Sequence, residues 1–142
     1  MPVTVVYSTR AVAEGGRSGR VRSLDGPFET ELSTPRDLGG EGGAGATPEQ
    51  LFAAGFAASF LGAMKAAATA DGMPKVPADG AVTAEVGLGP NGLGGLAMTA
   101  ELSIHLPGLD PEAAERLIRA ARDLCPFSAA VRGNINVRLR RL

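Results

Sequence analysis

The stretch TPEQLFAAGFAASFLGAMKAAATA, residues 47–70, determines how the rest of the sequence is interpreted. Thr47 is placed to cap a helix, and Pro48 suits the first helical position. Gln50 completes a capping box three residues after the cap. Because Asp71 and Gly72 follow as a stop signal, we expect a helix over residues 48–70.

The apolar residues of this helix lie on every side of it and alternate with alanine and glycine. The large ones are Leu51, Phe52, Phe56, Phe60, Leu61 and Met64. Such a helix is buried all round, and its small residues let neighbouring backbones approach closely. A chain of 142 residues leaves much apolar surface exposed, so we expect burial against a second copy in a homodimer.

Strand signals stand on both sides of the helix. Segments rich in β-branched or alternating apolar residues cover residues 3–9, 20–24, 28–33, 81–88, 96–106 and 134–139. A second helix opens at Asp110 and must end by Cys125, because Pro126 follows. The order βββ-α-ββ-α-β predicts an α+β fold with mainly antiparallel pairing, in a single domain over residues 1–142.

Composition excludes several classes of protein. The formal net charge is −1 and the hydrophobic fraction is 44%, so nothing draws the whole chain towards nucleic acid or an anionic membrane. The longest mostly apolar run, residues 51–64, is shorter than the roughly 20 residues of a membrane span. One cysteine permits neither an internal disulfide nor a cysteine-rich metal site. We expect a cytoplasmic protein without a bound metal, because the N-terminus lacks a secretory signal pattern.

Three motifs favour ordinary structural explanations. Gly40, Gly42 and Gly45 match a dinucleotide fingerprint, but the strand that should precede it is interrupted by Pro35. His105, the only histidine, falls on the polar face of a strand, away from any candidate nucleophile. The arginines near the C-terminus alternate with apolar residues, which is typical of the polar face of a strand.

Ser59 and Cys125 have plain interpretations as well. Cys125 suits a small buried apolar residue, and its place at a helix C-terminus disfavours the thiolate, since that end of the dipole is negative. Cys125 is therefore better suited to close a disulfide than to attack first. Ser59 lies in the middle of the first helix, where a serine hydroxyl commonly bonds back to the carbonyl one turn earlier.

Three separated stretches resemble the organic hydroperoxide resistance proteins, a branch of the OsmC-like superfamily. They are GGRSGRVRS at 15–23, TPEQLFAAGFAASFLGA at 47–63 and CPFSAAVRGNINV at 125–137. The resemblance extends from the first predicted strand to the last residue, and the three motifs occur in the same order. It implies an OsmC-like fold with a long central helix, in an intertwined homodimer whose active sites form between subunits.

The resemblance also implies an activity and partners. Members of this family reduce organic and fatty-acid hydroperoxides, and lipoyl groups on partner proteins supply the electrons. No cofactor is bound in such a reaction; the reductant is an external dithiol. A lipoylated protein is accordingly the expected electron donor.

Four positions correspond to the family's catalytic residues. The cysteine that attacks the peroxide corresponds to Ser59, and the resolving cysteine corresponds to Cys125. Arg17 matches an arginine that keeps the attacking thiolate charged, and Glu49 matches a glutamate that orients this arginine. A guanidinium offsets the cost of a thiolate in an apolar pocket, and a carboxylate fixes the geometry of the guanidinium.

Serine at position 59 departs from the family's pattern. Oxygen cannot form the sulfenic acid that a thiolate forms, so we expect the chain to be inactive by the two-thiol route. The serine is either introduced or natural. Phenylalanine at positions 56 and 127, where tyrosine is usual in the family, is a sign of natural change, whereas introduction is the slightly favoured explanation, and both stay open. Two alternatives stay open: a binding protein that holds a hydroperoxide or fatty acid without reducing it, and a serine hydrolase using Ser59, which lacks an evident base.

Overall fold

The structure is a computed structural model that describes residues 2–142. The chain divides into two compact units, Met1–Leu51 and Phe52–Leu142, and each is described by itself. Both units combine helical turns with a three-stranded sheet, which confirms the α+β prediction.

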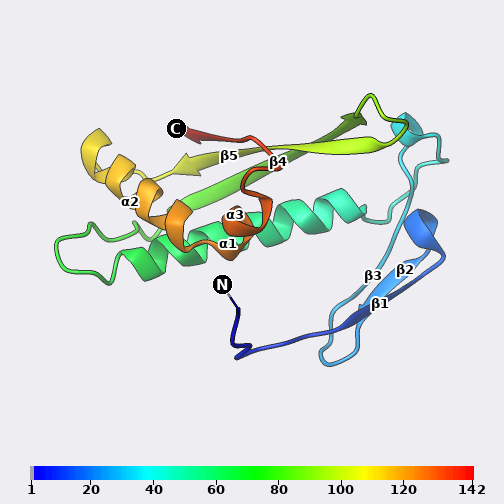
Figure 1. The fold of residues 1–142 in the computed structure, drawn as a ribbon, viewed down its shortest axis with the longest axis horizontal. Helices are drawn as coiled ribbons and strands as arrows, with labels where there is room; N and C mark the ends of the chain where they lie inside the picture. Colours follow the sequence, from blue (N-terminus) through cyan, green and yellow to red (C-terminus); the bar gives the residue numbers. More distant parts are fainter. Residues whose placement is uncertain (1) are drawn as a thin grey trace. The chain divides into compact units, whose positions relative to one another are not determined.

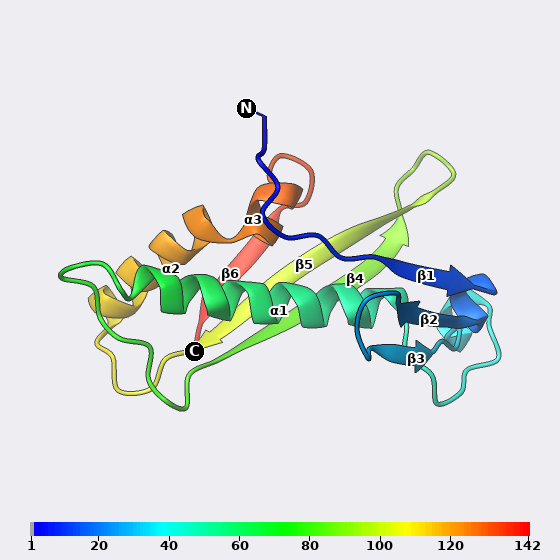
Figure 2. The same ribbon diagram turned by 90° about the horizontal axis from the view of Figure 1, so that it is seen from below.

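The first unit is built on a small antiparallel sheet. Its strands are β1 (Ala11–Glu14), β2 (Arg20–Ser23) and β3 (Glu29–Glu31), in the order β1-β2-β3 (Figure 2). Two short 3-10 turns, η1 (Gly16–Ser18) and η2 (Arg36–Leu38), interrupt the connections. The hairpin predicted around residues 20–33 is therefore present, with shorter strands than expected.

The prediction of a strand over residues 3–9 is wrong. No strand is assigned there, and β1 begins only at Ala11. Val3, Val6 and Tyr7 are exposed, with Val6 at 95%. β-branched residues favour a strand only when a neighbouring strand pairs with it, and these residues have no such neighbour within residues 2–142.

The glycine-rich loop before the first long helix owes its composition to close backbone packing. The Gly45 N–H donates a 2.9 Å hydrogen bond to Ser33 Oγ. A Cβ atom at Gly45 would lie 2.6 Å from the same oxygen, so only glycine fits. Since a 3-10 turn and not a strand precedes this loop, the arrangement is not that of a dinucleotide-binding fingerprint.

The second unit holds the longer elements (Figure 1). They are α1 (Pro48–Ala67), whose first turn belongs to the first unit, β4 (Ala81–Pro90), β5 (Leu96–His105), α2 (Pro111–Leu124), α3 (Pro126–Val131) and β6 (Val137–Arg141). The sheet order is β4-β5-β6. β4 pairs with β5 antiparallel, whereas β6 returns through α2 and α3 to pair with β5 parallel.

The core of the second unit lies between the sheet and the helices. Its largest fully buried side chains are Phe56, Phe60, Met64, Leu102, Ile104, Leu117 and Cys125. Along β5, residues 100, 102 and 104 are buried and their neighbours are not, so the predicted alternation is confirmed. The opposite face of this strand carries Glu101 and His105, towards solvent.

The start of α1 follows the sequence prediction, but its burial does not. The Gln50 N–H donates to Thr47 Oγ1 and the Thr47 N–H donates to Gln50 Oε1, each at 3.0 Å, which is the capping box. However, Ala54, Ala58 and Gly62 form an exposed stripe along the helix. The expectation of a helix buried all round is therefore wrong for the single chain, whose own core covers one face only.

Two features near the C-terminus also differ from the predictions: the start of the last strand and an additional helix. The last strand begins at Val137 instead of residue 134, because the chain turns at Gly133, where φ is +78°. The helix α3 was not predicted at all. The sequence prediction uses Pro126 only as the residue that ends α2. Proline also suits the first position of a helix, and Pro126 occupies that position in α3.

Candidate functional site

Cys125 terminates one helix and begins another. Its N–H donates to the carbonyl of Ala121 at the end of α2, at 2.8 Å. Its Sγ accepts a hydrogen bond from the Ser128 N–H at 3.5 Å and so caps the N-terminus of α3. The side chain is 1% exposed. The thiol is thus held between two helix ends, with its sulfur on the side where backbone N–H groups point.

Ser59 is the nearest polar side chain to this thiol. Ser59 Oγ lies 3.5 Å from Cys125 Sγ, and the two residues are separated by 66 positions in sequence. The hydroxyl therefore contacts the sulfur and, within residues 48–67, makes no hydrogen bond to a carbonyl of its own helix, contrary to the expectation for a serine in mid-helix. The structure brings together the two residues that the sequence analysis assigned to attack and resolution.

The surroundings of Cys125 favour its thiolate on balance. Burial raises the pKa of the thiol, but hydrogen bonds from Ser59, Ser128 and the Phe127 backbone outweigh it, so the pKa lies below that of an ordinary cysteine. The expectation that a helix C-terminus disfavours this thiolate is therefore wrong. The reasons are the Ser59 hydroxyl first and then the first N–H groups of α3, which face the sulfur.

Three phenylalanine rings pack together beside these helices. Phe52 and Phe56 meet edge to face with centroids 5.9 Å apart, and Phe127 lies 6.2 Å from Phe52 and 5.9 Å from Phe56. A Cβ atom at Gly55 would lie 3.1 Å from the Phe127 ring, so glycine permits this close approach. Together the rings form an apolar cluster on the first half of α1 and the start of α3, in which Phe56 is fully buried and Phe52 and Phe127 are partly exposed.

Arg17 and Glu49 form a two-pronged ion pair within the first unit. Arg17 Nη1 donates to Glu49 Oε1 at 2.7 Å, and Nη2 donates to Oε2 at 3.0 Å. Arg17 lies in η1, which follows Gly15 and Gly16, both with positive φ (77° and 63°). Glu49 lies in the first turn of α1, where the helix dipole also favours a carboxylate. The pairing of these two residues is confirmed, and their nearness to Ser59 stays a prediction.

The ion pair shifts the titration of both partners. Its hydrogen bonds are the main cause that raises the pKa of Arg17 and lowers the pKa of Glu49. Because the Glu49 pKa is depressed on folding, pairing stabilises the fold above the unfolded pKa and this contribution is lost as pH falls through the folded pKa. The guanidinium stays charged as the pH falls, so the protonation of Glu49 alone determines whether the ion pair forms.

We expect the pair to open in acid with a midpoint below the ordinary glutamate pKa. The side-chain NMR signals of Arg17, followed on an acid titration, should report this transition. Glu49→Gln should abolish the transition, since the amide does not titrate. A midpoint at or above the ordinary glutamate value would show that the two-pronged geometry is not kept in solution.

The other residues singled out in the sequence take structural roles. His105 is exposed at the end of β5. Arg138 and Arg140 lie 3.8 and 3.5 Å from Glu101, and Arg141 lies 3.4 Å from Glu115. Among residues 2–142, no group of three potential metal ligands is found, and no helix is long and apolar enough to cross a membrane.

One functional group escaped the sequence analysis. The Ser128 N–H, which stabilises the sulfur of Cys125, depends on a helix that was not predicted. The Cys-Pro dipeptide at 125–126 was the available signal, because a capping residue followed by proline often marks a helix start.

Comparisons with known proteins agree with this fold. The family model for OsmC-like proteins matches residues 40–140. An organic hydroperoxide resistance protein of Xanthomonas axonopodis pv. citri is 48% identical over 97% of this chain and 96% of its own. Crystal structures of organic hydroperoxide resistance proteins from Legionella pneumophila and Bacillus subtilis superpose with TM-scores of 0.89 and 0.85. Their identities are 41% and 33%, and they cover 97% of this chain and 98% and 100% of their own.

Proposed function

The chain belongs to the organic hydroperoxide resistance branch of the OsmC-like family, and we propose that its fold serves the reduction of organic hydroperoxides by two thiols. The observation that carries this proposal is the contact between position 59 and Cys125. In the proposed site the chain carries serine at the attacking position. The form with Ser59 is therefore arrested before the first chemical step.

The proposed reaction balances in three steps. When position 59 is cysteine, its thiolate attacks the distal oxygen of the hydroperoxide, so the O–O bond breaks and a sulfenic acid forms on the sulfur. The alkoxide that leaves takes a proton from water and becomes the alcohol. Cys125 condenses with the sulfenic acid to give a disulfide and water. An external dithiol then reduces the disulfide by exchange and becomes oxidised itself. We propose a lipoyl group on a partner protein as this dithiol.

Arg17 and Glu49 serve the first step in this proposal. A cation favours the thiolate over the thiol and binds the negative charge that develops as the O–O bond breaks. Glu49 holds the guanidinium by both prongs, which fixes its plane. The partly exposed rings of Phe52 and Phe127, supported from the core by Phe56, favour hydroperoxides with an apolar group.

The test is hydroperoxide consumption by the chain with Ser59, using cumene hydroperoxide and dihydrolipoamide. We expect a rate near background, because a serine hydroxyl is not deprotonated at neutral pH and forms no sulfenic acid. Cys125→Ser serves as the control. Turnover that disappears in Cys125→Ser would contradict the two-thiol proposal and assign the chemistry to Cys125 alone, whose pKa is already lowered.

A homodimer is the second part of the proposal. The exposed stripe Ala54, Ala58 and Gly62 on α1 and the exposed apolar residues Val3 and Val6 leave surface that a second copy would cover. Light scattering at low micromolar concentration should report twice the mass of the chain, 14.4 kDa. A stable monomer under these conditions would rule out an active site shared between subunits.

A further inference from the structure

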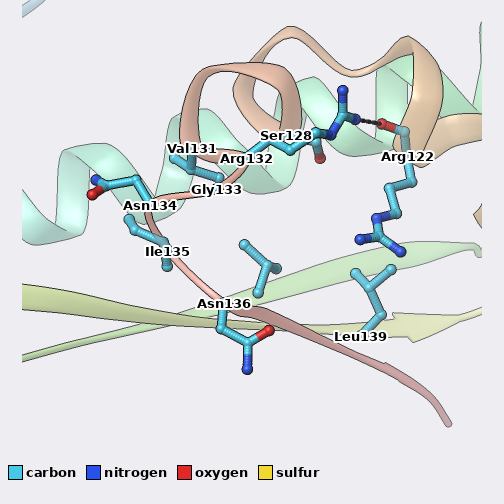
Figure 3. Close-up of a pocket in the computed structure, with 10 residues that line it drawn as sticks. Arg122, Ser128, Val131, Arg132, Gly133, Asn134, Ile135, Asn136 and Leu139 are labelled. Atoms are coloured by element: carbon cyan, nitrogen blue, oxygen red, sulfur yellow. Dashed lines mark hydrogen bonds between the residues drawn. The ribbon is translucent and has the colours of Figure 1, made fainter.

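A pocket opens between the end of α2, the helix α3 and the chain leading into β6 (Figure 3). Its volume is about 370 Å³, within the range of small-molecule sites. Neither Ser59 nor Cys125 lines it. The proposed peroxide chemistry makes no use of this pocket.

One part of the pocket wall is aliphatic and the other part is polar. Besides Arg122, the polar lining residues are Ser128, Arg132, Asn134 and Asn136. The aliphatic part consists of Val131, Ile135, Val137 and Leu139, all of which belong to the core or pack against it. Packing against the core fixes these side chains, so the apolar surface exists before any ligand arrives. Pre-formed apolar walls of this kind favour an aliphatic group of the ligand.

Arg122 supplies the charge at one end. Figure 3 shows its side chain descending from α2 towards Leu139. Among residues 2–142, Arg122 has no carboxylate within 4.0 Å, so its charge is available to a ligand. The guanidinium of Arg132 is engaged differently, since its Nη2 donates to the carbonyl of Arg122 at 3.3 Å and so stabilises the end of α2.

The positive charge continues beyond Arg122. A second hollow between α2 and β6 shares Arg122 and Leu139 with the pocket and adds Arg119, Arg141 and Glu115. Glu115 is already paired with Arg141. The net charge of this groove is therefore positive, although the net charge of the whole chain is −1.

From this combination we propose that the pocket binds an aliphatic monocarboxylate of medium chain length. The carboxylate pairs with the two-pronged guanidinium of Arg122, and the alkyl chain lies against Ile135, Val137 and Val131. A bare inorganic anion would leave the apolar walls unused, and an uncharged chain would leave the arginine unpaired. The pocket is a second ligand site, which adjoins the thiol site through Ser128 but is lined by neither Ser59 nor Cys125.

Binding of octanoate to the purified protein tests this inference. Calorimetry should show that octanoate binds. Acetate and inorganic phosphate, which lack the alkyl chain, and 1-octanol, which lacks the carboxylate, should bind at least about ten-fold more weakly. Backbone amide NMR shifts caused by octanoate should centre on residues 131–139. The readout does not depend on peroxide chemistry, so it is independent of the proposed function.

Two variants and one control sharpen the result. Arg122→Gln should weaken octanoate binding about ten-fold or more, and Arg122→Lys should recover part of it, since the charge returns without the fork. Arg138→Gln removes the same charge from β6 outside the pocket and should leave octanoate binding unchanged. Amide spectra of the variants check that the fold is kept.

Three results would overturn the inference. They are the absence of octanoate binding, equal affinity for inorganic phosphate, and octanoate shifts that centre on Phe52, Phe56 and Phe127 instead of the pocket. An equal loss of octanoate affinity in Arg122→Gln and Arg138→Gln would also contradict the inference, because it would show that octanoate is attracted by the overall positive charge and not by Arg122 in the pocket.

Discussion

Ser59→Cys should convert a chain that consumes hydroperoxide at the background rate into an active peroxidase. The expected gain is on the order of a hundred-fold or more, because only a thiolate is both nucleophilic at neutral pH and able to accept oxygen. Hydroperoxide consumption with cumene hydroperoxide and dihydrolipoamide measures the gain. Peroxide without reductant should instead stop the reaction at a disulfide between positions 59 and 125.

The geometry already favours that disulfide. The two side-chain atoms lie 3.5 Å apart, and rotation of the side chains can bring two sulfurs to the bonding distance of about 2.05 Å. Mass spectrometry of the oxidised variant should find the bridge with a loss of two protons. As a matched control, Ser128→Cys places a second thiol one helical turn from Cys125 and should not restore turnover. Equal activity in the unsubstituted chain and in Ser59→Cys would refute the assignment of position 59.

Arg17→Ala in the Ser59→Cys background should reduce turnover at pH 7 by about 10- to 1,000-fold. Removing a cation that faces a thiolate raises the thiolate pKa by about 1–3 units, and each unit costs about ten-fold in thiolate at a fixed lower pH. The rate should therefore recover as pH rises. This recovery separates loss of charge from loss of fold, since an unfolded site would not regain activity in alkali.

Two further variants complete this test. Arg22→Ala removes an exposed arginine from β2 and should leave the pH profile unchanged. Glu49→Gln keeps Arg17 but weakens its two-pronged pairing, so its effect should be smaller than that of Arg17→Ala. An Arg17→Ala variant with an unchanged pH profile would remove Arg17 from the proposed mechanism.

Local signals in the sequence predicted most of the elements. The capping box at Thr47 and Gln50, the Asp25-Gly26 turn between β2 and β3 and the alternation along β5 each depend on neighbours within a few residues, so they could be found without a structure. The segment 3–9 shows the limit of such signals. Its β-branched residues predicted a strand, but a strand also needs a partner, which local patterns do not reveal.

The candidate site could be predicted only through the resemblance. Arg17 and Glu49 are 32 positions apart, and Ser59 and Cys125 are 66 apart, so spacing alone gave no reason to pair them. The character of Cys125 was misjudged because it depends on the Ser59 hydroxyl of α1 and on the N–H groups of α3, a helix of 6 residues that was not predicted. Together these hydrogen bonds outweigh burial and lower the pKa of the thiol.

The parallel pairing of β6 with β5 has a consequence for how the chain folds. Hairpins such as β4–β5 join residues close in sequence, whereas Val137 pairs with Ala100 across the whole of α2 and α3. Closing a long loop costs entropy before any stabilising contact has formed, so pairing of this kind is slow. We expect the hairpins to form early and β6 to add last. Hydrogen exchange during refolding should then protect the amides that bond β4 to β5 before those that bond β5 to β6.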